Sequence, residues 1–190
     1  MNYVTAYYLK GKGRELFLEE YCTQGSNVVI GGLSEGNLAQ TEPLGSTAAN
    51  LETWSHHFPW GKLAKTPCKG IRRIEAELSE SKITEDMIIF TGIEEEIYLL
   101  NTSHSNYKAY VISGFFGAGH ARKITGDFRG KAESGAGILL VSADFMEGVE
   151  ERQIGQALRF EGEPEEKQAM RHLKELAGGR DGAAILIIFR

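Results

Sequence analysis

Two aspartates, Asp144 and Asp181, occupy positions from which they could bind one metal ion together. Asp144 follows the apolar residues 138–141, a run typical of a buried strand. Asp181 precedes a second apolar run, residues 183–189. Carboxylates at the ends of two buried strands can converge on a divalent cation, because hard cations bind oxygen ligands. An aspartate after a strand also commonly caps a helix, so capping is the alternative role for Asp144.

The surrounding pattern predicts the elements that position these aspartates. Two helical segments are expected between them, and the second should stop at Gly178 and Gly179. Strands are expected over residues 1–9, 15–21, 28–30, 87–91, 96–101 and 107–113. Helices are expected over residues 47–63, with an interruption at Pro59, and from Pro67 onward. Residues 114–137 contain many glycines and are predicted to be irregular.

The series from residue 137 to 190 resembles the carboxy-terminal part of the metal-dependent serine/threonine protein phosphatases of type 2C. That family shows an apolar strand, then Ser-Asp-Gly, two helices, and Asp-Asn before the last strand. Since both family aspartates are metal ligands, the resemblance implies this role for Asp144 and Asp181. Two letters differ, because Phe145 stands in place of the family's Gly and Gly182 in place of its Asn.

A glycine-rich stretch, residues 31–37, follows the apolar residues 28–30 and is predicted to be a loop. The equivalent family loop reads approximately Ala-Asp-Gly-Met-Gly-Gly. Its Asp bridges two metals, and the next Gly offers a carbonyl oxygen. The resemblance makes Gly32 the carbonyl ligand and puts Gly31 where the bridging aspartate should be. Without that carboxylate the chain lacks the anion that holds two cations close together.

Charged residues upstream and downstream also fall near family positions. Glu15 could replace an acidic residue of the family's amino-terminal motif and act as a metal ligand. Lys10 or Lys12 could replace the family's phosphate-binding Arg. An ordinary solvated turn is the alternative. His104 replaces an aspartate associated with an additional metal, and Asp127 lies in a stretch similar to the family's Leu-Thr-x-Asp.

The resemblance implies Mn²⁺ or Mg²⁺ as the cofactor, held weakly or not at all. Two carboxylates and one carbonyl suit one hydrated cation. They would hardly fix two cations at ~3.5–4 Å separation, as two-metal catalysis requires.

Composition limits the partners that we expect. The 190 residues are 42% hydrophobic and 25% charged, which fits one globular domain. A net charge of -5 gives no electrostatic reason to expect nucleic acid or an anionic membrane. No apolar run approaches the ~20 residues of a membrane span, and no secretory signal pattern opens the sequence, so we expect a cytoplasmic protein. Cys22 and Cys68 are expected to be reduced and partly buried, with a disulfide as the alternative.

We therefore predict one α+β domain over residues 1–190, a four-layer α-β-β-α sandwich of two antiparallel sheets flanked by helices. Three function classes follow. The first is a catalytically impaired type 2C-like domain that binds a phosphoprotein or regulatory protein. The second is an active, divergent Mn/Mg-dependent phosphatase. The third is an unrelated α+β interaction module. The sequence does not indicate the oligomeric state.

Overall fold

The computed structural model describes residues 1–23, 25–35, 54–80, 86–103, 105–115 and 119–190, and these contain two antiparallel sheets. In spatial order, sheet A consists of β1 (Tyr3–Lys10), β10 (Gly182–Phe189), β9 (Gly137–Ser142), β6 (Tyr107–Ser113) and β7 (His120–Ile124). In spatial order, sheet B consists of β2 (Arg14–Thr23), β3 (Ser26–Glu35), β4 (Met87–Ile93), β5 (Glu96–Asn101) and β8 (Phe128–Lys131).

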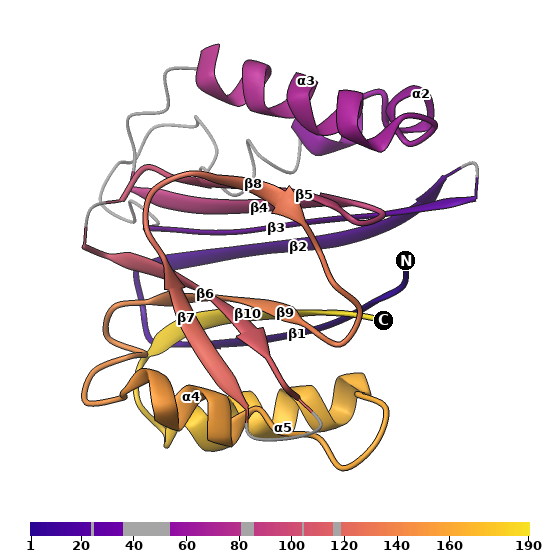
Figure 1. The fold of residues 1–190 in the computed structure, drawn as a ribbon. Coiled ribbons are helices and arrows are strands. Elements are labelled where there is room, and N and C mark those ends of the chain that lie inside the picture. Colours follow the sequence, from indigo (N-terminus) through magenta and orange to yellow (C-terminus); the bar gives the residue numbers. More distant parts are fainter. Residues whose placement is uncertain (24, 36–53, 81–85, 104, 116–118) are drawn as a thin grey trace.

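The two sheets stack face to face, and helices cover both outer faces (Figure 1). The outer face of sheet B carries α2 (Trp60–Leu63) and α3 (Pro67–Glu80). The outer face of sheet A carries α4 (Glu151–Ala157) and α5 (Glu166–Ala177). This arrangement confirms the predicted four-layer α-β-β-α sandwich.

Apolar side chains fill all three spaces between the layers. In β10, Leu186 packs toward the α4 and α5 side, whereas Ile185 and Ile187 pack between the sheets. A strand covered on both faces has no position for a polar side chain, which explains the continuous apolar run from residue 183 to 189. In α3, Ile71, Ile74 and Leu78 form one buried stripe against sheet B.

The helix boundaries follow the local sequence signals. Pro59 directly precedes α2, and Pro67 is the first residue of α3, as predicted. Gly178 adopts the left-handed conformation (φ 57°) just after α5, so the predicted helix stop is confirmed. Of the helix predicted over residues 47–63, residues 47–53 lie outside the described part of the chain.

Three predictions about secondary structure are wrong. Residues 31–35 belong to β3 rather than to a loop, and β4 extends to Ile93, beyond the strand predicted over residues 87–91. The stretch 114–137 contains β7 and β8. Both are edge strands with polar, exposed residues, so they lack the apolar run that marked the central strands.

Two further expectations concern the surface. Cys22 and Cys68 are unpaired, but both are exposed rather than partly buried. Among the described residues, no helix is long and apolar enough to cross a membrane. The cytoplasmic location expected from the sequence stays a prediction.

Candidate functional site at one end of the sheets

Strand ends from both sheets meet at the left-hand end of the molecule in Figure 1, which we call the rim. Here β1 ends at Lys10 opposite Gly182 of β10, and β2 begins at Arg14 opposite Glu35 of β3. The end of β9 adjoins the start of β6, since Ser142 pairs with Tyr107. Because the pairings are antiparallel, residues distant in the sequence are brought to the same edge.

Asp144 lies in the turn after β9 and forms an ion pair with Arg14 of the other sheet. The Arg14 side chain is 21% exposed and that of Asp144 is 34% exposed, so the pair is half-buried. The capping role considered for Asp144 is wrong. The N-cap of α4 is Glu150, which completes a capping box with Gln153.

Asp181 lies just before β10 and is 65% exposed. Its nearest cationic partner among the described residues is Lys10, with 3.9 Å between Lys10 Nζ and Asp181 Oδ1. Lys10 also donates a hydrogen bond to the carbonyl of Gly179. Asp181 therefore belongs to a solvated surface pair, whereas Asp144 bridges the two sheets.

The other two predicted ligands do not join these aspartates. Glu15 lies on the same face of β2 as Phe17, which packs toward the α3 side, so its side chain is directed away from Arg14. Gly32 lies three residues before the end of β3 and pairs with Phe17 and Ile89. Its carbonyl belongs to a central strand of the sheet, where it points toward a neighbouring strand rather than toward the rim.

Glu35 is the rim carboxylate that the sequence interpretation missed. Alternation along β3 puts Glu35 on the face of Val29 and Leu33, which pack between the sheets. It is the cross-strand partner of Arg14. Since β3 continues three residues beyond Gly32, the strand ends at Glu35, which is followed in the sequence by Gly36.

Tyr107 is buried near the charged side chains of Arg14, Glu35 and Asp144. Its side chain is 2% exposed, and its hydroxyl has no hydrogen-bond partner within the described part of the chain. Burial raises the pKa of Tyr107 above its ordinary value. The charge of Glu35 raises this pKa further, as does that of Asp144, and the charge of Arg14 lowers it. All three charged groups thus act on one buried phenol.

A hydrogen-bonded turn ties the start of β6 to the rim. The backbone carbonyl of Asn106 accepts a hydrogen bond from the backbone N–H of Ala143 (2.7 Å), and the side-chain amide of Asn106 donates one to Asp86 (2.6 Å). Ser103 Oγ accepts the backbone N–H groups of Asn106 and Tyr107. His104 lies outside the described residues, and Asp127 accepts a bond from the Asn101 N–H group (2.9 Å).

The two departures from the family pattern pack against each other. Gly182 has a φ of 140°, and a Cβ added there would lie 2.8 Å from the backbone nitrogen of Phe145. The Phe145 side chain is fully buried and packs edge-on against Tyr8. The backbone path after Asp144 therefore depends on the absence of a side chain at position 182, whatever the size of the residue at position 145.

The carboxylates of the rim are not gathered into a metal-binding group in the described part of the chain. Among the described residues, no group of three or more His, Cys, Asp or Glu side chains is arranged to hold a metal ion. Asp144 is paired with Arg14, and Asp181 is near Lys10. The guanidinium of Arg14 and the ammonium of Lys10 therefore supply positive charge beside the same carboxylates that a metal ion would bind.

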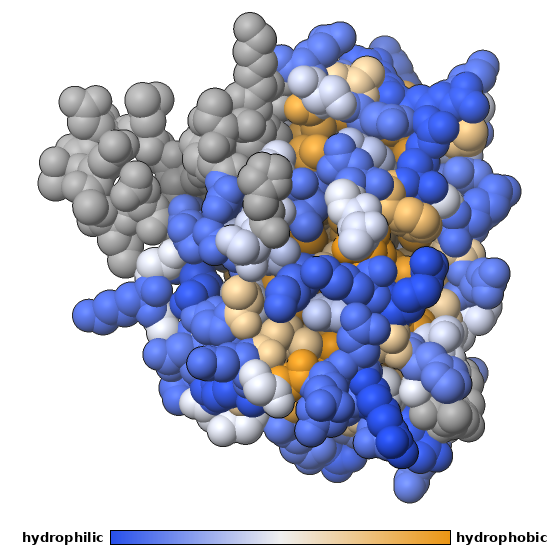
Figure 2. Space-filling view, turned by 60° about the vertical axis from the view of Figure 1, so that its left-hand side comes forward, coloured by the Kyte–Doolittle hydropathy of each residue, from blue (hydrophilic) through white to orange (hydrophobic). Residues whose placement is uncertain are grey.

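The surface around the rim is mainly hydrophilic, with hydrophobic residues between the charged ones (Figure 2).

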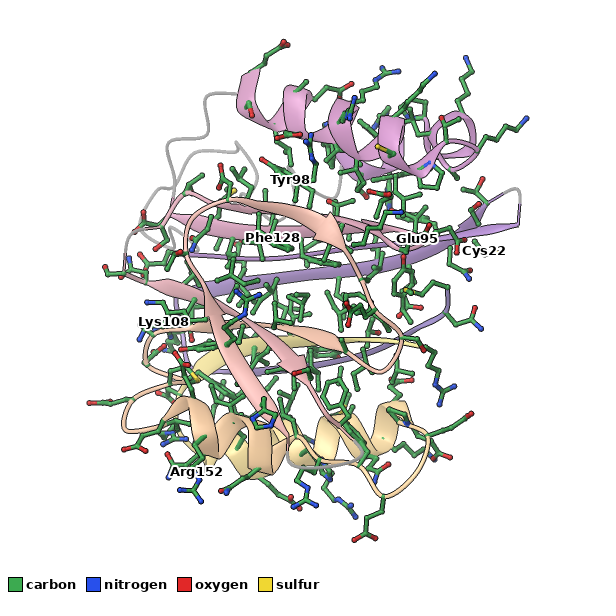
Figure 3. All side chains as sticks on the ribbon, in the orientation of Figure 1. Cys22, Glu95, Tyr98, Lys108, Phe128 and Arg152 are labelled. Carbon is green, nitrogen blue, oxygen red and sulfur yellow. The ribbon has the colours of Figure 1, made fainter. Side chains whose placement is uncertain are left out.

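Figure 3 shows how the sheets separate inner and outer side chains, since Tyr98 of β5 is directed toward α3 while Phe128 of β8 lies between the sheets.

Solved structures similar to this chain include bacterial serine and serine/threonine phosphatases. A variant of a bacterial serine phosphatase is 15% identical, with 97% of this chain and 96% of that chain covered and a TM-score of 0.55. The S. agalactiae serine/threonine phosphatase is 11% identical over 100% and 99% of the two chains, with a TM-score of 0.52. The Mycobacterium tuberculosis serine/threonine phosphatase PstP/Ppp is 13% identical over 100% and 99%, with a TM-score of 0.51.

These similarities establish the fold, and they confirm the resemblance to type 2C phosphatases inferred from the order of the sequence motifs. No family model matches the sequence, and no curated protein matches it. The chain is therefore a phosphatase-like domain by fold.

Proposed function

We propose that this domain is catalytically impaired and acts as a binding or regulatory protein. The observation that carries the proposal is the ion pair between Arg14 and Asp144. Asp144 is the residue matched to a metal-binding aspartate of the type 2C family. In this chain a side chain of the protein neutralises its charge.

The guanidinium of Arg14 competes with any metal ion for the Asp144 carboxylate. The positive charge is a permanent property of the arginine side chain. A metal ion would have to displace Arg14 and leave that half-buried charge without its partner. The remaining candidate carboxylates, Asp181 and Glu35, are more exposed and would have to offset this cost.

The turn between β1 and β2 suggests the kind of partner. It carries Lys10, Lys12 and Arg14 within five residues, and Lys12 is exposed. Cations grouped on one turn favour an anionic ligand such as a phosphorylated protein segment. Arg14 would then pair with the ligand when it is bound and with Asp144 when it is absent, and no hydrolysis would take place.

The test is hydrolysis of para-nitrophenyl phosphate and of a phosphoserine peptide with Mn²⁺ or Mg²⁺. The control is the double variant Asp144→Ala, Asp181→Ala. We expect the wild-type chain to show no turnover above that control. A binding titration with the same phosphopeptide and its unphosphorylated form should show preference for the phosphorylated one, and Arg14→Gln should reduce that preference. Metal-dependent turnover that disappears in the double variant would refute the proposal.

An active, divergent phosphatase is the second candidate, and Glu35 favours it. This residue supplies a carboxylate at the end of β3, where the sequence interpretation had found none. If the domain is active, Glu35→Gln should abolish metal-dependent turnover, whereas Glu15→Gln, on the opposite face of the sheet, should leave it unchanged. The stacked sheets favour both candidates over the third class, an interaction module unrelated to phosphatases.

A further inference from the structure

The four sheet edges differ in how they are protected. Strands at an edge usually carry charged side chains that discourage pairing with another chain. The edge strand β2 contains Glu15, Glu19 and Glu20, and both β7 and β8 contain two basic residues. In contrast, β1 has no charged residue before Lys10, and it contains neither proline nor glycine.

The free side of β1 presents regularly spaced backbone groups. Asn2 and Arg190 exchange backbone hydrogen bonds, and the register continues from this pair along β1 and β10. The even-numbered residues of β1 therefore direct their N–H and C=O groups toward β10. The odd-numbered residues, from Tyr3 to Leu9, direct theirs away from the sheet, where an added strand could bond to them.

Two large hydrophobic side chains accompany these open backbone groups. In the described part of the chain, the exposed large hydrophobic residues are Tyr7, at 50%, and Leu9, at 45%. Both belong to the odd-numbered set. Covering these side chains would remove apolar surface from water in the same contact that satisfies the backbone groups.

The charges at the two ends of β1 are opposite. At its start, the lining of a hollow of about 320 Å³ includes three acidic residues, Glu20, Glu165 and Glu166, and one basic residue, Arg190. At its end lie Lys10 and the exposed Lys12. An antiparallel copy of the same strand would bring the basic end of one molecule to the acidic end of the other, twice.

We propose that β1 pairs antiparallel with β1 of a second copy of this chain, so that sheet A continues across a two-fold axis. With Tyr7 opposite Tyr7 of the second copy, Thr5 faces Leu9 and Val4 faces Lys10 of that copy. Odd residues then meet odd residues, as the outward backbone groups require. The aromatic pair lies at the axis, and each Lys10 approaches the hollow that contains Glu165 and Glu166. This interface uses no rim carboxylate, but it does use Lys10 and Lys12 of the turn proposed above to bind an anionic ligand, so the molar mass is measured without phosphopeptide.

The experiment measures molar mass by sedimentation velocity and light scattering at protein concentrations up to about 100 μM, where a micromolar dimer would be populated. The wild-type chain is expected to form a dimer whose fraction rises with concentration. Thr5→Pro removes an outward N–H group and leaves the bonds from β1 to β10 in place, so it should yield a monomer. Thr5→Val keeps the N–H group and loses the hydroxyl bond to Glu20, so it should remain a dimer.

A charge exchange provides a second test that does not depend on proline. Lys12→Glu should lower the dimer association constant by about tenfold or more, since it places like charges together at both ends. Adding Glu166→Lys should restore the association, while Arg122→Glu on β7, the other edge of sheet A, should have no effect. A monomeric wild-type chain, or a folded Thr5→Pro variant with the wild-type dimer fraction, would overturn the proposal. So would a Lys12→Glu variant that dimerises as the wild type does.

Discussion

The two aspartates matched to the phosphatase family lie in different surroundings. Asp144 follows β9, is half-buried and pairs with an arginine from the opposite sheet. Asp181 precedes β10, is 65% exposed and approaches a lysine only to 3.9 Å. Both occupy the family's position relative to their strands. Equivalent positions in the chain have therefore acquired unequal electrostatic roles.

The difference shows that the position at which a strand ends does not determine which charges surround that end. Burial of β9 and β10 fixes where each strand ends, whatever side chain follows. What a carboxylate does at that end depends on the charges brought there by other strands. Here those charges are basic and come from β1 and β2.

The largest effect on stability is expected at the contact between Gly182, which follows Asp181, and Phe145, which follows Asp144. Gly182→Asn, which restores the family's letter, should lower the free energy of unfolding by about 2–4 kcal/mol, because of the positive φ and the overlap with the Phe145 backbone. Chemical denaturation would measure it. Gly178→Asn is the matched control, since Gly178 has open space and a left-handed conformation that Asn tolerates, and should cost well under ~1 kcal/mol. Equal costs for the two variants would contradict the close contact.

The two aspartates should differ when each is removed. Asp144→Ala leaves the half-buried Arg14 guanidinium unpaired and should cost about 1–2 kcal/mol. Asp181→Ala removes only a solvated surface pair and should cost less than ~0.5 kcal/mol. Urea unfolding at low and high salt would compare them. If the Asp181 variant proved the less stable, the contrast between the two turns would be wrong.

The smallest effect concerns Tyr107, which lies near Asp144. Because burial and carboxylates raise the pKa of Tyr107, the folded chain keeps this proton at a pH where the unfolded chain has lost it. The resulting stability is present below the unfolded pKa of about 10 and is lost as the pH rises above it. Tyr107→Phe should change stability at neutral pH by less than ~1 kcal/mol, since the hydroxyl has no partner among the described residues.

Above pH 10 the Tyr107→Phe variant should lose less stability than the wild-type chain. Tyr98→Phe serves as the comparison on the outer face, where burial, with Asp127 and Glu75, raises the pKa of Tyr98 to about 12. Thermal unfolding between about pH 9 and 11 would measure both variants. An identical alkaline decline in the wild-type and Tyr107→Phe chains would show that this phenol is not shielded at the rim.

Most of the fold could be predicted because its central strands are buried on both faces. A strand such as β10 must be apolar throughout, and its run of residues is therefore visible in the sequence. The edge strands β7 and β8 could not be recognised in this way, since one side of each is solvated. Glycine misled the prediction in β3. Gly31 lies inside the strand, where a Cβ added to it would lie 3.2 Å from the Leu18 side chain and 3.5 Å from that of Ile185.

The candidate site was predictable only in part, because its partners come from different sheets. The pairing of Arg14 with Asp144 joins residues 130 positions apart, and no local pattern indicates it. Glu35 carried a signal that could have been used. The alternation from Val29 through Leu33 continues to Glu35, and it places the last residue of β3 beside the first of β2.

The Arg14–Asp144 pair also bears on how this domain would respond to its environment. The charge of a site that binds divalent cations rises and falls with their concentration, and chelators or metal starvation change it. The guanidinium of Arg14, in contrast, is a covalent part of the chain, so its charge does not depend on the concentration of any ion. If no metal binds at the rim, as proposed, the charge balance at this end of the molecule is set at synthesis, and a partner that recognises it would meet the same surface whether divalent metals are scarce or abundant.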